Sequence, residues 1–137
     1  MSTRSTITLH TPKGYDSIYC HWDGHTSDVG KTLKTHYNTL KRVKALIALG
    51  SLSALYKNLE PEEGVRHSFA DPADGVTVAY HRDRGEGRKP DILKFETLLE
   101  VATHGEQYNY VFQDDEWRLV VKKSNVAFLV PYNTNED

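Results

Sequence analysis

The sequence predicts an α+β fold, in which an antiparallel sheet, made of an N-terminal hairpin and C-terminal strands, carries helices packed on one face. Two observations predict the sheet and one predicts the helices. Polar and apolar residues alternate over residues 4–23 and again over 107–132, with short turns between the alternating runs. Between them, apolar residues recur at helical spacing over residues 29–59. A chain of 137 residues has the size of one domain, so residues 1–137 are expected to form a single globular domain.

The first hairpin is predicted from two alternating runs around a Pro-Lys-Gly turn. Ile7 and Leu9 lie on the apolar side of residues 4–11, and Ile18, Cys20 and Trp22 lie on the apolar side of residues 16–23. We expect Leu9 to face Ile18, because this register brings the two apolar sets together. Trp22 is then expected to be a core residue.

The same register gathers polar side chains on the opposite face of the hairpin. Arg4 is expected opposite Asp23, and Thr6 opposite His21. This face is the first candidate binding surface. Its residues are Arg4, Thr6, Tyr19, His21, Asp23 and His25.

The middle of the chain is predicted to hold three helical segments, a long loop and a fourth helix. Thr26 or Ser27 is expected to cap the first helix, and Gly50 to end the second. Ser51 is expected to cap a third helix that carries Leu52, Leu55 and Leu59. The remaining expected elements are a surface loop at 60–75, a strand at 76–81, a charged loop at 82–89, a helix from Asp91 to Gly105, a hairpin at 107–122 and a strand at 126–132.

The stretch from Gly24 to Thr32 resembles a phosphate-binding loop in part. Five residues separate Gly24 from Gly30, however, whereas the G-x-x-x-x-G-K-[ST] motif has four. The extra residue would turn the loop amides away from a common phosphate. We therefore expect Gly30 to serve the close packing of a helix.

Two further hypotheses concern chemistry at His21 and Asp23. A histidine beside a carboxylate can move protons, so these residues are weak catalytic candidates for a hydrolase or nucleotide-modifying enzyme in which Arg4 binds a phosphate. His21, Asp23 and His25 also alternate as zinc ligands could, but Gly24 is expected to swing His25 away. Cys20 on the apolar side is not an activated nucleophile. No metal or cofactor is expected, and the lack of a persuasive catalytic constellation disfavours an enzyme.

The third hypothesis is nucleic-acid binding through the charged loop. Arg82, Arg84, Arg88 and Lys89 could hold a single strand if aromatic residues lie nearby. Acidic residues dilute this loop, and 17 basic against 19 acidic residues give the chain a net charge of −2. The absence of an overall basic field disfavours nucleic acid as the partner.

Composition predicts a soluble cytoplasmic protein without a membrane partner. The single cysteine excludes an internal disulfide and fits a reducing compartment. The longest nearly apolar run, residues 45–49, is far shorter than the ~20 residues that cross a bilayer.

One set of short segments carries a resemblance to known proteins. The segments are TR-x-TI at residues 3–7, IYCHWDG at 18–24, VG-x-x-L at 29–33, HY at 36–37, and further stretches at 45–53, 67–86 and 107–117. Through them, and most of all over residues 3–37, the chain resembles a set of small, mostly uncharacterised proteins encoded by phages and prophages. The resemblance implies the cytoplasm of an infected bacterium and no established reaction. We therefore expect a non-catalytic accessory protein that binds a host or defence macromolecule.

Overall fold

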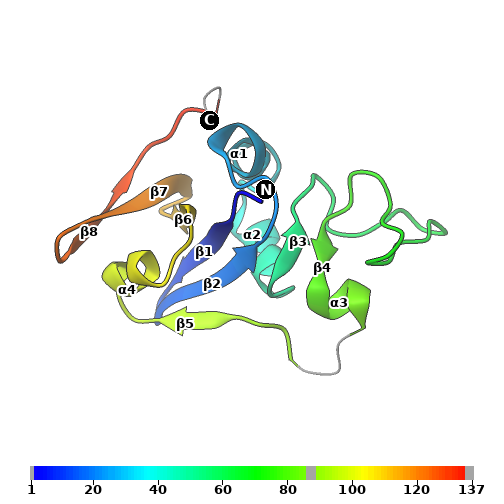
Figure 1. Cartoon of the computed structure of the whole chain (residues 1–137), viewed down its shortest axis with the longest axis horizontal. Coiled ribbons are helices and arrows are strands. Elements are labelled where there is room, and N and C mark those ends of the chain that lie inside the picture. Colours follow the sequence, from blue (N-terminus) through cyan, green and yellow to red (C-terminus); the bar gives the residue numbers. More distant parts are fainter. Residues whose placement is uncertain (1, 86–88, 135–137) are drawn as a thin grey trace.

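Two N-terminal strands, β1 (Ser5–Thr11) and β2 (Gly14–Cys20), pair antiparallel at the centre of a mixed, mostly antiparallel eight-stranded sheet (Figure 1). This arrangement comes from a computed structural model that describes residues 2–85 and 89–134. The sheet and its four short helices confirm the expected α+β class, with an N-terminal hairpin and C-terminal strands. In the described part of the chain, no helix is long and apolar enough to span a membrane.

The register of the first hairpin differs from the prediction by two residues. Ile7, rather than Leu9, faces Ile18, and the turn closes over Pro12 and Lys13 alone. A tight two-residue turn fixes the register of a hairpin, and a shift of two keeps every side chain on its expected face. The shift nevertheless has a consequence, because Ser5 now faces Cys20 and β2 ends there.

Strand order across the sheet is β4-β3-β2-β1-β6-β7-β8, and β5 pairs with the first half of β2. The pairs β1–β6 and β2–β3 are parallel, whereas the other ladders are antiparallel. The remaining strands are β3 (Leu52–Ala54), β4 (Val78–Ala79), β5 (Leu93–Phe95), β6 (Tyr108–Gln113), β7 (Glu116–Lys123) and β8 (Val126–Val130).

Helices lie on both faces of the sheet, not on one face as expected. One face carries a π-helical turn (Thr26–Gly30), α1 (Lys31–His36) and α2 (Leu40–Ile47), whose buried residues join Ile7 and Ile18 in the larger core. The other face carries α4 (Leu98–Thr103), whose Val101 packs against Val111 and Val120 in a smaller core. Successive residues of β6 face opposite sides, so one strand contributes to both cores.

Two predicted helices take other forms. The segment after Ser51 is β3, because Leu52 pairs with Cys20 of β2 and with Ala79 of β4. The segment after Asp91 is β5, and its helix, α4, starts only at Leu98 behind a Thr97 capping box. The strand expected at 76–81 is reduced to β4, after which the chain turns into α3 (Tyr80–Arg84).

Candidate functional site

Trp22 lies on the surface just beyond the end of β2, with 44% of its area exposed. The prediction that it is a core residue was wrong. Because β2 ends at Cys20, the backbone of His21 and Trp22 instead bonds to β3, with N–H···O distances of 3.0 Å to Leu52 and Ser53. The large indole is therefore presented to solvent by a backbone that is held in the sheet.

The chain is fixed again immediately after Trp22. Asp23 adopts a left-handed φ of 57°, and the amide of Gly24 donates to the carbonyl of Thr3 at 2.8 Å. A side chain at Gly24 would lie only 2.9 Å from that carbonyl oxygen, so glycine is required here. Trp22 thus has an ordered backbone on both sides.

Three rings, those of Tyr19, His21 and Trp22, form a continuous aromatic row. The Tyr19 hydroxyl lies 2.6 Å from His21 Nδ1, and the His21 and Trp22 rings meet edge to face with centroids 4.7 Å apart. Burial raises the pKa of Tyr19, and the Arg4 charge lowers it by less. The hydrogen bond between Tyr19 and His21 joins the phenol to the imidazole and holds the two rings together.

A groove of about 510 Å³ adjoins the row at Tyr19. It lies where β2 leaves β5 and approaches β3, and charged residues of both signs stand on its rim. Arg4 is exposed near Tyr19, and its guanidinium has no partner among the residues that the structure describes. The groove is lined by Ser17, Tyr19, Ser51, Lys89, Pro90, Asp91, Ile92 and Leu93.

The other residues of the predicted polar face do not join the row. Thr6 is 7% exposed and donates to Asn109 Oδ1 at 2.7 Å. The backbone carbonyl of Asp23 accepts a hydrogen bond from the amide of Val29, and no hydrogen bond links Asp23 to His21 or Arg4. His25 Nε2 lies 3.0 Å from the Thr3 hydroxyl, and the His25 ring meets the Tyr108 ring edge to face. The expected face is thus divided: Tyr19 and His21 remain together, with Arg4 near Tyr19.

The geometry gives no activated nucleophile or metal cluster at this end of the sheet. Cys20 is fully buried, and burial raises the pKa of its thiol to about 12, so the thiol stays protonated. Within residues 2–85 and 89–134, no three His, Cys, Asp or Glu side chains lie where they could share a metal ion.

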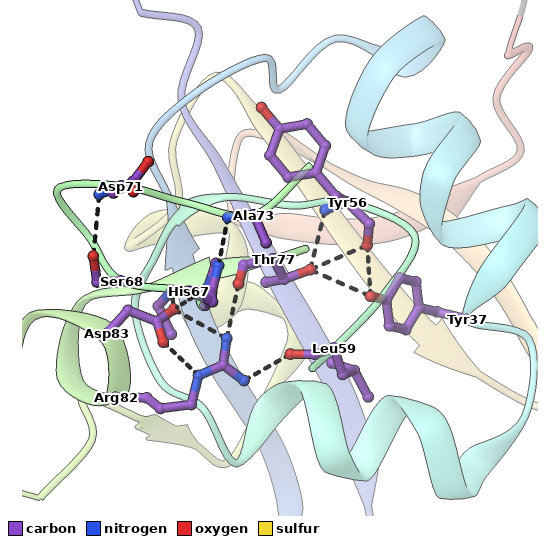
Figure 2. Close-up of polar contacts among 11 residues, drawn as sticks. Tyr37, Tyr56, Leu59, His67, Ser68, Asp71, Ala73, Thr77, Arg82 and Asp83 are labelled. Atoms are coloured by element: carbon purple, nitrogen blue, oxygen red, sulfur yellow. Dashed lines mark hydrogen bonds and ion pairs between the residues drawn. The ribbon is translucent and has the colours of Figure 1, made fainter. Parts of the chain in front are cut away.

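Arg82, a predicted binding residue, is instead committed to contacts inside the protein (Figure 2). Its guanidinium donates to Asp83 at 2.7 and 3.0 Å, to the carbonyl of Leu59 at 2.6 Å and to that of Thr77 at 2.8 Å. Little donor capacity is left for a phosphate. Arg84 lies over the rings of Tyr80 and Phe69, and Arg88 falls outside the described residues.

His67 and Asp83 form a buried pair that the sequence analysis missed. His67 Nε2 lies 3.1 Å from Asp83, and His67 Nδ1 accepts the amide proton of Ala73 at 2.9 Å (Figure 2). A general base needs a free ring nitrogen, and both nitrogens of His67 are occupied. The pair therefore fastens the 60–75 loop to α3. The two residues are 16 positions apart across an irregular loop, so no local sequence pattern predicts their contact.

The segment that resembles a phosphate-binding loop forms a packed corner. Tyr110 donates to the carbonyl of Gly24 at 2.7 Å, and Tyr132 donates to that of Gly30 at 2.8 Å. A side chain at Gly30 would stand 2.7 Å from the Tyr132 ring. Gly30 therefore allows the close packing that was expected of it.

Comparison with known proteins gave no significant match among family models, curated proteins or solved structures.

Proposed function

We propose that this chain is a non-catalytic binding protein whose partner is another protein, held at the aromatic row of Tyr19, His21 and Trp22. The observation that carries the proposal is the exposure of Trp22 on an ordered backbone. Tryptophan and tyrosine are enriched among the residues that dominate protein–protein affinity. A preordered anchor also loses little conformational entropy when it is buried by a partner.

The chemistry around the row supports protein as the partner class. His21 places its imidazole beside the indole, and Arg4 is exposed near Tyr19. A large ring surrounded by a few polar groups is the usual composition of an interface centre and its rim. An extended basic surface, which nucleic acid would need, is not supported by Arg82, because its donors serve internal acceptors.

Catalysis at His21 and Asp23 has less support. A proton shuttle needs the imidazole and carboxylate within hydrogen-bonding reach, and His21 bonds to Tyr19 instead. The resemblance of residues 3–37 to phage-encoded proteins directs the proposal to a host or defence protein in the bacterial cytoplasm.

The test is to capture partners from a bacterial lysate with the wild-type chain and with Trp22→Ala, and then to measure affinity for each purified partner. Loss of a central tryptophan is expected to weaken binding by about 30-fold or more. Because Trp22 is on the surface, its loss should change the free energy of unfolding by less than about 1 kcal/mol.

Tyr56→Ala is the matched control, because Tyr56 has the same exposed fraction, 44%, and lies outside the row. Its effect on affinity should be small. Failure to capture any protein reproducibly, or equal losses in the two variants, would contradict the proposal.

A further inference from the structure

Strand β8 ends the sheet with an apolar, uncharged edge. Its five residues, VAFLV, include no charged side chain, although charges are the usual protection of an exposed edge strand. Val126 and Phe128 are 61% and 43% exposed on the face that carries α1 and α2. Ala127 and Leu129 point to the opposite face and pack in the smaller core. Among the described residues, none pairs with the outer edge of β8.

The register of the β7–β8 hairpin identifies the backbone groups that face outward. A two-residue turn, Ser124-Asn125, makes Lys123 and Val126 a hydrogen-bonded pair. Antiparallel ladders alternate bonded and non-bonded pairs, so Phe128 and Val130 also bond to β7. The N–H and C=O groups of Ala127 and Leu129 are therefore directed away from the sheet.

This pattern is complementary to itself. If two β8 strands meet antiparallel about a two-fold axis at Phe128, Ala127 of each copy faces Leu129 of the other. Both residues then exchange their free N–H and C=O groups, which gives about four hydrogen bonds. A two-fold interface requires that one surface match its own copy, and this register meets that requirement without a shift.

The side chains match in the same register. Phe128 faces Phe128 of the second copy in a non-bonded pair, where side chains approach most closely. Val126 faces Val130 on the same side of the sheet, so each exposed apolar side chain meets another apolar one. No like charges oppose each other along the strand, and Pro131 ends the pairing because it has no N–H to donate.

We infer that β8 is a self-association surface, through which two copies of this chain join their sheets edge to edge. The contact is independent of the aromatic row, which lies at the end of β2. Pairing of one short strand buries less than the area of a standard interface, so the dimer is expected to form with micromolar affinity.

Sedimentation velocity of the wild-type chain over a range of concentrations up to about 100 μM should show a monomer–dimer equilibrium. Phe128→Asp places two carboxylates opposite each other at the axis and should weaken dimerisation by at least about 30-fold. Val65→Asp is the matched control, because Val65 is 48% exposed in the 60–75 loop. A wild-type chain that is monomeric throughout, or a dimer that is insensitive to Phe128→Asp, would overturn the inference.

A cysteine pair tests the register itself. Phe128→Cys brings two thiols together across the axis within the distance that a disulfide allows, and the native Cys20 is buried and does not compete. Val126→Cys is the control, because residue 126 faces residue 130 of the other copy and not itself. Mild oxidation should cross-link the first variant and leave the second uncross-linked. Equal cross-linking of both variants, or of neither, would show that this register does not form.

Discussion

Asp83 accepts hydrogen bonds from a neighbouring guanidinium, a histidine and a backbone amide while only 4% of its side chain is exposed. Burial by itself raises the pKa of this carboxyl, but the bonds from Arg82, Ala79 and His67 and the Arg82 charge outweigh it, so the pKa is lower than usual. A carboxyl whose pKa is lowered by folding stabilises the fold at pH values above the pKa that it has in the unfolded chain. That stabilisation is lost as the pH falls through the pKa that the carboxyl has in the folded protein.

Replacement of Asp83 by Asn should therefore destabilise the protein at neutral pH by about 2–4 kcal/mol, because it leaves Arg82 charged and poorly paired. The difference from wild type should shrink from about pH 4 downward, because the carboxyl first protonates in the unfolded chain and then, at lower pH, in the folded protein. Urea unfolding at a series of pH values measures both effects. Asp74→Asn, at an exposed aspartate of the same loop, should change stability by less than about 0.5 kcal/mol. A constant difference between wild type and Asp83→Asn at all pH values would contradict the assignment.

Trp22 shows how a correct local pattern can mislead about one residue. The alternation of Ile18, Cys20 and Trp22 is real, and the first two are buried as predicted. Burial of the third required β2 to continue for two more residues. The turn at Pro12 and Lys13 set a register in which β1 has no residue left to pair with them in the sheet. Alternation predicts which face a side chain takes and does not predict where the strand ends.

At the scale of elements, the corner before α1 depends on the absence of one methyl group. Gly30 has ordinary helical angles, φ −57° and ψ −45°, and at such a position alanine normally stabilises a helix by about 1 kcal/mol. Here the new Cβ would lie 2.7 Å from the Tyr132 ring and 3.1 Å from that of Tyr110. Both rings are buried and held by hydrogen bonds, so neither can move aside cheaply.

Gly30→Ala should therefore destabilise the protein by about 1–3 kcal/mol, a change opposite in sign to that expected from helix propensity. Denaturant unfolding measures it. Thr35→Ala in the exposed part of α1 serves as the control and should stay within about 0.5 kcal/mol of wild type. A Gly30→Ala variant more stable than wild type would mean that the corner has room to adjust.

Which elements could be predicted depended on how local their causes are. Both hairpins were predictable because alternation and turn residues are adjacent in the sequence. The segment after Ser51 was not, because the spacing of Leu52 and Leu55 also fits a helix. The segment forms a strand because it pairs with β2 and β4, which are distant from it in the sequence. The candidate site was predicted only in part for the same reason, since the bonds that expose Trp22 come from β3.

Across the whole molecule, three buried phenols join distant segments by donating to backbone carbonyls. Tyr37 donates to Tyr56 at 2.6 Å, and Tyr110 and Tyr132 donate to the corner at Gly24 and Gly30. Burial raises the pKa of all three. In the unfolded chain they ionise near pH 10, so their contribution to stability is complete below that pH and is lost as the pH rises above it.

Alkaline unfolding should therefore occur cooperatively above about pH 10 and coincide with ionisation of these three tyrosines. The test measures phenolate absorbance and a folding probe such as circular dichroism over the same pH range and compares the two transitions. Tyr132→Phe removes one of the protons lost on unfolding and should reduce the pH dependence of stability by about 1.4 kcal/mol per pH unit. Ionisation of all eight tyrosines without unfolding would show that the phenols are accessible.

The parallel pairing of β1 with β6 joins residues 103 positions apart, Ser5 with Tyr108 among them. A ribosome releases β1 long before it has synthesised the strand that must lie beside it. Until then, one side of the central hairpin lacks its neighbour, and the chain must keep this side from binding elsewhere. Completion of the sheet is thus tied to the synthesis of β6, and a messenger truncated ahead of the codon for Tyr108 would yield a product with a bare strand at its centre.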